Sequence, residues 1–557
     1  MSSGHQIIAD QLRQLGVSAL FGVMGDGNLQ VIRSFIDLGG RYIAARHESG
    51  AVAMADGYAR VTGEVGVATC TLGPGLTNAM TALVSARKAG SPVVLVSGDL
   101  PNDPNRVRSL LEVQRIDQAT FARSVGLAVT SLEIGSIASG VAEAVESAQR
   151  LSCPVVLLVP KDLQDDLHDE ESGAAHPSQG RAFAEDRPVP DPVSVDEAMS
   201  ALRASRRRVV VAGRGAVQAD ARPLLLELGR RMPAFLGTTL RAKDLFKGEP
   251  ATLDIVGGYS SALTKRVLED ADCVLVLGAS LNDHTTVENE LVGSHQTMIR
   301  CDTNKTSIEQ GPHIRVGVVA DAREFAQVLL DRLPESKLPI DGEWFASTRE
   351  GLLSHRRDDE YSRPATDRGL DPRWIAMRLD ESLPRRILVV DSGHFSGFAN
   401  VYIHVDEPGD YVFAHDFGAV GLGMGSAIGA AIGRPEDRVV LVIGDGGLMM
   451  SLVDLETAAR ERLSLVVIVF NDGGYGAEAH RLRLAGADPG PALFANPSFE
   501  GVARSLGCVG VTLRTPEDLA GLQDLLGDTG RPLLIDCHLD PMIRSRTMDA
   551  LYRNVAG

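Results

Sequence analysis

The sequence predicts an α/β protein made of three doubly wound parallel-sheet domains. At 557 residues the chain is too long for a single hydrophobic core. Apolar, β-branched runs alternate with helix-like segments, as expected for parallel strands that helices cover on both faces. Polar stretches without hydrophobic periodicity, at 164–192 and 354–369, are typical of linkers. We therefore expect domains at residues 1–165, 190–335 and 369–557.

The individual elements follow this alternation in each block. The first block predicts a helix that ends near residue 15, and strands at 20–23, 42–45, 66–71, 92–97 and 154–159. In the second block we expect strands at 208–212, 273–277 and 298–302. In the third block, apolar runs predict strands at 387–390, 439–443 and 465–470, with an amphipathic helix at 451–460.

Composition and charge argue against several classes of protein. The formal net charge of −18 disfavours a nucleic-acid or anionic-membrane partner. Six cysteines lie scattered without CxxC spacing, which favours reduced, buried thiols. The start of the chain is polar and helix-like rather than a signal peptide, and no apolar stretch is long enough for a membrane-spanning helix. These features are typical of a cytoplasmic enzyme.

The most informative segment is 439–473. Its first strand breaks at Gly444-Asp445-Gly446-Gly447, and its second strand ends at Asn471-Asp472-Gly473. Strand, helix and strand form a βαβ unit, in which both carboxyl ends lie on the same edge of the sheet. Asp445 and Asn471 can therefore converge on one point.

These residue types indicate a metal ion bound together with phosphate groups. A carboxylate, an amide oxygen and the backbone carbonyl of Gly473 suit Mg²⁺, which completes its coordination shell with phosphate oxygens and water. The nearby glycines let backbone N–H groups approach those phosphates. We therefore predict Asp445, Asn471 and Gly473 as metal ligands. The predicted phosphate contacts are Gly444, Gly446 and Gly447.

This pattern resembles the thiamin-diphosphate motif of the superfamily that contains acetolactate synthase, pyruvate decarboxylase and benzoylformate decarboxylase. The three α/β blocks resemble its pyrimidine-binding, central and diphosphate-binding domains, so the likeness covers nearly the whole chain. The resemblance implies thiamin diphosphate and Mg²⁺ as cofactors, and a small 2-oxo acid or related carbonyl compound as substrate. It also implies a homodimer or homotetramer, in which Glu48 of one chain meets the metal-bound cofactor of another.

The first block carries the residues that this resemblance places at the aminopyrimidine. Glu48 follows a strand-like run and opens a helix of small residues, so the resemblance gives it the hydrogen bond to N1′ that activates the cofactor. Gly73 and Asn78 lie in a turn similar to the family's Gly-Pro-Gly-x-x-Asn. The glycine there allows close approach to the cofactor, and the asparagine supports the turn.

Two further positions in this block bear on the reaction. Asp26 resembles the aspartate that pyruvate decarboxylases use in proton transfer. Gln114 falls on the active-site glutamine of acetolactate synthase. The paired histidines of simple decarboxylases are missing from 102–118. Asp26 therefore favours simple decarboxylation, whereas Gln114 and the missing histidines favour carboligation.

The third block adds two loops and the start of a helix. Gly393 and His394 follow a strand at the place where family members hold the diphosphate. Gly418 and Val420 match a family element that contacts the cofactor. In that element the glycine carbonyl accepts a hydrogen bond from the 4′-amino group of the cofactor, and a hydrophobic side chain wedges under the cofactor. The wedge is usually larger than valine, so this chain either enforces the cofactor conformation less tightly or leaves room for substrate. Tyr475 is a further candidate beside the cofactor. Glu478 and His480 are candidates that face the reacting carbon.

The resemblance favours decarboxylation followed by carboligation, as in acetolactate synthase. The alternatives are a non-ligating 2-oxo acid decarboxylase, a 2-hydroxyacyl-CoA lyase, a diketone-cleaving enzyme and a flavin-dependent oxidoreductase similar to pyruvate oxidase. A central block with 213–215 and 278–283 resembles one that binds FAD in some relatives and another nucleotide, or nothing, in others. FAD is therefore an open alternative. A catalytically silent scaffold is disfavoured by the joint presence of Glu48, Asp445 and Asn471.

Overall fold

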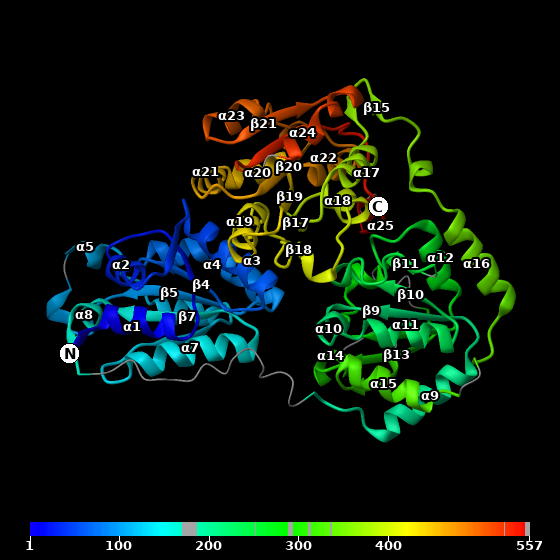
Figure 1. Cartoon of the computed structure of the whole chain (residues 1–557), viewed down its shortest axis with the longest axis horizontal. Helices are drawn as coiled ribbons and strands as arrows, with labels where there is room; N and C mark the ends of the chain where they lie inside the picture. Colours follow the sequence, from blue (N-terminus) through cyan, green and yellow to red (C-terminus); the bar gives the residue numbers. More distant parts are fainter. Residues whose placement is uncertain are drawn as a thin grey trace.

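The computed structural model of the chain describes residues 1–107, 109–169, 187–250, 252–287, 293–309, 314–334, 337–527 and 530–551. Within these residues the chain forms three six-stranded parallel sheets with flanking helices (Figure 1). The predicted fold class is confirmed. Most of the first predicted linker lies outside the described residues. The domain boundaries stay a prediction.

The N-terminal sheet has the strand order β3-β2-β4-β5-β7-β6. Its strands are β2 (Ala19–Gly22), β3 (Arg41–Ala44), β4 (Gly66–Cys70), β5 (Val93–Asp99), β6 (Ala128–Ser131) and β7 (Val155–Pro160). The main helices are α1 (Gly4–Gln14), α2 (Leu29–Asp37), α3 (Glu48–Thr62), α4 (Pro74–Ala89), α6 (Gln118–Ser124) and α7 (Ile137–Leu151). The loops after β3, β2, β4 and β5 are therefore neighbours along one sheet edge.

The central sheet has the order β11-β10-β9-β12-β13-β14. Its strands are β9 (Arg208–Ala212), β10 (Ala234–Thr238), β11 (Thr252–Ile255), β12 (Cys273–Leu277), β13 (Thr297–Asp302) and β14 (Ile314–Val319). Its main helices are α9 (Pro192–Ala204), α11 (Arg222–Arg231), α12 (Ala262–Asp270), α15 (Ala322–Arg332) and α16 (Gly342–Ser354).

The C-terminal sheet has the order β18-β17-β19-β20-β22-β21. Its strands are β17 (Ile387–Val390), β18 (Tyr411–Phe413), β19 (Val439–Gly444), β20 (Leu465–Asn471), β21 (Val509–Leu513) and β22 (Leu533–His538). Its main helices are α17 (Pro372–Ser382), α18 (Ser396–Tyr402), α19 (Gly423–Gly433), α20 (Asp445–Ser451), α21 (Val453–Arg460), α22 (Gly476–Leu484), α23 (Phe499–Ser505) and α25 (Arg546–Leu551). In the register of β19 against β20, Gly444 lies opposite Phe470, one residue before Asn471.

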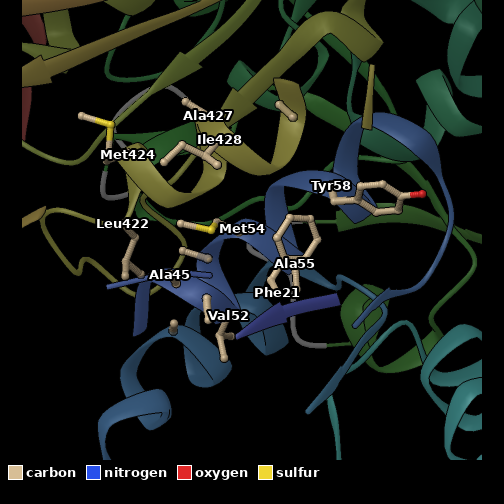
Figure 2. Close-up of a cluster of buried hydrophobic side chains, with 14 of the residues drawn as sticks. Phe21, Ala45, Val52, Met54, Ala55, Tyr58, Leu422, Met424, Ala427 and Ile428 are labelled. Atoms are coloured by element: carbon tan, nitrogen blue, oxygen red, sulfur yellow. The ribbon is translucent and has the colours of Figure 1, made fainter. Parts of the chain in front are cut away.

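Helices α3 and α19 join the N-terminal and C-terminal domains through one hydrophobic core. Figure 2 shows side chains of both helices in this core, among them Met54 of α3 and Met424 and Ile428 of α19. Glycine makes the close approach possible, because a Cβ at Gly429 would lie 1.8 Å from the carbonyl oxygen of Met54. The core therefore fixes how the carboxyl-end loops of the two sheets are oriented.

Most predicted strands agree with the structure to within one or two residues at each end, but the start of the helix after β19 was wrong. The sequence placed a turn at 444–447 and the helix only from 451, but α20 begins at Asp445, directly after β19. Glycine is a poor helix former, which is why the pattern suggested a turn. Glycine is nevertheless required within this helix, because a Cβ at Gly446 would lie 2.7 Å from the Tyr475 ring and one at Gly447 would lie 2.6 Å from Asp391. Among the described residues, no helix is both long and apolar enough to cross a membrane.

Candidate active site

Four neighbouring strands of the C-terminal sheet end at predicted site segments. These strands are β18, β17, β19 and β20, and the segments that follow them are 415–420, 391–394, 445–447 and 472–478. A cavity between these loops is lined by 392–395, 444–447, 474–478 and the side chains of Val420, Phe470 and Asp472. The cavity thus brings together the predicted residues Gly393, His394, Val420, Gly444, Asp445, Gly446, Gly447, Tyr475 and Glu478.

The two predicted side-chain metal ligands face the same atom. Asn496 donates from its amide nitrogen to Asp445 Oδ2 at 2.5 Å and to Asn471 Oδ1 at 3.2 Å. Asn471 in turn donates from Nδ2 to Asp536 Oδ1 at 2.9 Å, which aims its oxygen towards Asp445. The carbonyl of Gly473 accepts a hydrogen bond from the Phe494 N–H at 2.9 Å, so one lone pair of this third predicted ligand is in use.

Electrostatics at this point favour a cation. Burial, together with the neighbouring Asp472 carboxylate, raises the pKa of Asp445 to about 7. Burial also raises the pKa of Asp472 to about 7. Two such carboxyl groups beside an amide oxygen and a carbonyl make a hard-oxygen set that fits Mg²⁺. Among the described residues, no group of three or more His, Cys, Asp or Glu side chains could hold a metal ion by itself.

The glycines of α20 are needed because other groups come close. A Cβ at Gly446 would lie 2.7 Å from the ring of Tyr475, and one at Gly447 would lie 2.6 Å from Asp391 Oδ2 and 3.3 Å from Val420 Cγ1. Glycine is therefore required at both positions, and the helix dipole favours an anion at this end of α20.

A buried carboxyl group holds the loop that carries Gly418 and Val420. Asp391 accepts hydrogen bonds from the N–H groups of Gly421 at 2.9 Å and Gly423 at 3.0 Å, and burial raises the pKa of Asp391 to about 6. Gly418 itself has a φ of +72° and does not line the cavity around Asp445. It lines the cavity of the central domain instead.

The two predicted histidines of this domain pair with each other. The rings of His394 and His480 lie 4.6 Å apart, and burial lowers the pKa of both to about 4, so both are neutral at pH 7. The Ser545 N–H donates to His394 Nε2 at 3.0 Å. His480 is 3% exposed and is not among the residues that line the cavity. Its predicted place at the reacting carbon stays a prediction.

The N-terminal sheet edge holds the other predicted residues. Glu48 is the first residue of α3, and its Oε2 accepts a hydrogen bond from Asn78 Nδ2 at 3.0 Å. Gly73 has a φ of +63°, and a Cβ there would lie 2.2 Å from the carbonyl oxygen of Gln114. Asp26 is exposed on the loop after β2. Strand order thus brings Glu48, Asp26, Gly73, Asn78 and Gln114 to one edge, as predicted for parallel strands.

Within one chain this edge and the cavity around Asp445 are separate. No described residue of the N-terminal domain lines that cavity. The segment before Glu48 instead contacts α21, where the Arg46 N–H donates to Asp454 Oδ1 at 3.0 Å. The two groups of predicted residues therefore lie at separate places within one chain.

Family models match all three parts of the chain. They describe the N-terminal thiamine pyrophosphate (thiamin diphosphate) binding domain at residues 2–121, the central domain at 195–329 and the C-terminal binding domain at 391–537. The chain belongs to the thiamin-diphosphate enzymes.

Relatives cover almost the whole of this thiamin-diphosphate enzyme. It is 26% identical to the acetolactate synthase large subunit of Haemophilus influenzae, with 97% of this chain and 94% of that protein covered. It is 28% identical to the sulfoacetaldehyde acetyltransferase of Rhodobacter capsulatus, with 94% and 92% covered. It is 26% identical to an acetolactate synthase of Mycobacterium avium, with 98% and 90% covered. Lyase or transferase chemistry that depends on thiamin diphosphate follows from the family and these relatives.

The central domain of this enzyme has a cavity of about 950 Å³ at the carboxyl edge of its sheet. The predicted nucleotide-binding segments contribute Arg214, Gly215, Gly278, Ser280 and Asn282 to its walls. All three domains meet beside it at Asp416, which pairs with Arg60 Nη2 at 2.7 Å and with Arg241.

Sequence reasoning missed several residues of the site. Gln118 accepts from the Gly73 N–H at 3.0 Å and donates to the Gly98 carbonyl at 2.9 Å, which ties the Gln114 segment to β5. Asn496 was missed because it lies beyond the predicted motif, and no spacing rule connects it to Asp445. A polar residue just before Pro497, returning to the sheet edge, was the only signal available.

Proposed function

We propose that this chain is a Mg²⁺-dependent enzyme that decarboxylates a 2-oxo acid and joins the remaining acyl unit to a second carbonyl compound, as acetolactate synthase does. The observation that carries the proposal is the convergence of Asp445 and Asn471 on one point, with the Glu48–Asn78 pair at the edge of the other cofactor-binding domain. Asp445 and Asn471 would hold a metal-bound diphosphate, and the Glu48–Asn78 pair would contact an aminopyrimidine.

Each residue has a defined part in this proposal. When bound, thiamin diphosphate supplies a nucleophilic carbon and an electron sink for the loss of CO₂. Glu48 donates or accepts the proton at the pyrimidine nitrogen, and Asn78 orients its carboxylate through the 3.0 Å hydrogen bond. Val420, on the wall of the same cavity, would pack against the bound cofactor. Glu478, exposed on the cavity wall, is the candidate for proton transfer to the product.

We further propose a homodimer or homotetramer with active sites between subunits. Support comes from the separation of Glu48 from the cavity around Asp445 within one chain. Apolar side chains near the cavity loops are also exposed, as expected for a surface that a second copy covers; their exposed fractions are 46% for Phe417, 55% for Met450 and 54% for Val453. In this arrangement Glu48 of the second copy completes the site.

Carboligation is favoured over simple decarboxylation by Gln114. Its half-buried position against the Gly73 turn places it on the same edge as Glu48, where it can bind an acceptor carbonyl. A second candidate is acetyl transfer that involves sulfoacetaldehyde, which the 28% identity to a sulfoacetaldehyde acetyltransferase favours. Both functions use a two-carbon acyl unit, so the substrate distinguishes them.

Product analysis by NMR tests the proposal. The purified protein is incubated with thiamin diphosphate, Mg²⁺ and either pyruvate, other 2-oxo acids or sulfoacetaldehyde. We expect CO₂ and a 2-hydroxy-2-acyl product from pyruvate. Aldehyde as the sole product would instead assign a non-ligating decarboxylase, and consumption of sulfoacetaldehyde alone would assign the second candidate. A protein that binds no thiamin diphosphate in Mg²⁺ buffer would overturn the proposal.

Two further proposals concern the nucleotide of the central domain and the location of the protein in the cell. A flavin in the central cavity is an alternative to another nucleotide there, and the visible absorption spectrum of the purified protein tests it. None of the three family descriptions names a flavin. A cytoplasmic location is proposed from composition alone.

A further inference from the structure

The segment that carries Asn496 is fixed beside the proposed metal site. The Tyr475 N–H donates to the Ala492 carbonyl at 2.8 Å, and the Phe494 N–H donates to the Gly473 carbonyl at 2.9 Å. Pro497 then restricts the backbone of Asn496. With the main chain held on both sides, the side-chain torsions of Asn496 are its remaining freedom.

The amide of Asn496 lies where a cation bound to both predicted ligands would meet it. Its nitrogen donates to Asp445 Oδ2 at 2.5 Å and to Asn471 Oδ1 at 3.2 Å. N–H hydrogens directed at these two oxygens repel a cation that binds the same oxygens. A half-turn about the Cβ–Cγ bond exchanges the amide nitrogen for an oxygen of nearly the same size.

We propose that Asn496 is a further ligand of the divalent cation, with its Oδ1 turned towards Asp445 and Asn471. This inference rests on the proposed Mg²⁺ dependence. The position of the amide supports it, because Asn496 Oδ1, once turned, would face the same point as the side-chain oxygens of Asp445 and Asn471. The charge balance supports it too. Asp445 and Asp472 already place two carboxyl groups at the site, so a neutral amide adds an oxygen ligand without adding like charge.

Metal binding by the full-length protein tests the inference without any enzyme assay. The probe is Mn²⁺ with inorganic diphosphate, followed by electron paramagnetic resonance for affinity and by water-proton relaxation for the number of water molecules on the bound ion. The variants are Asn496→Leu, which has a similar size and no oxygen, and Asn496→Asp, which keeps an oxygen. Asn102→Leu, at an exposed position of the N-terminal domain, is the matched control.

We expect Asn496→Leu to bind Mn²⁺ about 10- to 100-fold more weakly and to add one water to the ion. Asn496→Asp should keep the wild-type water number, and the control should match wild type. An unchanged water number and an unchanged or higher affinity in Asn496→Leu would show that Asn496 is only a hydrogen-bond donor, which overturns the inference. If Asn496→Leu does not fold, Asn496→Asp with one water fewer than wild type overturns it equally, because its carboxylate would then be a ligand where Asn496 was none.

Asp445→Ala separates this inference from the proposed function. If the wild type binds no Mn²⁺, the proposed metal site itself fails. If Asp445→Ala abolishes binding while Asn496→Leu has no effect, the metal site stands and the assignment of Asn496 is wrong.

Discussion

Metal binding should weaken as the pH falls below about 7, because Asp445 must lose its proton to become a ligand. Burial and the Asp472 carboxylate raise the pKa of Asp445 from 3.8 to about 7. Below that pH the protonated form predominates, and a cation must displace the proton. Above it the carboxylate is already ionised, so the affinity should be constant.

The size of the effect follows from the pKa. At pH 5, about two units below the pKa, roughly one Asp445 in a hundred is ionised, so the affinity should fall about 100-fold, or about 3 kcal/mol. The pKa of Asp472 is also raised to about 7. If both groups must ionise, the slope of log affinity against pH approaches two; if only Asp445 must, it stays near one.

Titration with Mn²⁺ alone from pH 5 to pH 8 measures this slope without the phosphate groups of the cofactor, which titrate near pH 6. Asp472→Asn removes the neighbouring negative charge and should shift the curve to lower pH. The reasoning would be refuted by an affinity that is the same at pH 5 and pH 8.

The remaining predictions concern the other half of the site, the glycines and the product. Glu48→Gln should retain the cofactor but slow proton exchange at its C2 carbon by about 10²–10⁴-fold; exchange measured by NMR at the wild-type rate would remove Glu48 from this role. Co-assembled Glu48→Gln and Asp445→Ala chains, each inactive alone, should recover about a quarter of wild-type activity if sites form between subunits, and none if each chain holds its own site. Gly447→Ala should destabilise the protein by about 1–3 kcal/mol in thermal unfolding because its Cβ meets a buried carboxylate oxygen, whereas Gly342→Ala, with open space around its Cβ, should not. Glu478→Gln should change the ratio of aldehyde to ligated product, and an unchanged ratio and rate would exclude it from the reacting face.

Much of the fold follows from local pattern, because buried parallel strands are continuous apolar runs. The runs at 439–443 and 465–470 became β19 and β20 with one more residue each. The start of α20 could not be predicted in this way. Its glycines disfavour a helix locally, and only the approach of Tyr475 and Asp391 explains why no other residue fits. Helix propensity depends only on residues that are close in the sequence. Tyr475 and Asp391 are far from Gly446 and Gly447 in the sequence and come close to them only in the folded chain.

The same distinction separates the site residues that sequence could and could not reveal. Asp445 and Asn471 were predictable as a pair because parallel strands bring their carboxyl ends to one edge whatever the side chains are. Asn496 reaches that edge through the backbone pairing of Gly474 with Leu493, which no periodicity signals. Gln118 likewise depends on how the segment after β5 folds back on Gly73.

The contact between α3 and α19 keeps the Glu48 edge and the cavity around Asp445 apart within one chain, which agrees with the proposal of sites between subunits. Its core contains glycines approached so closely by backbone that the two helices have almost no room to slide; a Cβ at Gly57 would lie 2.0 Å from the Ser426 carbonyl oxygen. Interiors packed in this way resist small shifts. The Glu48–Asn78 pair and the loops around Asp445 are therefore presented as rigid, partly exposed edges, and a symmetric second copy can supply each edge with the half that it lacks.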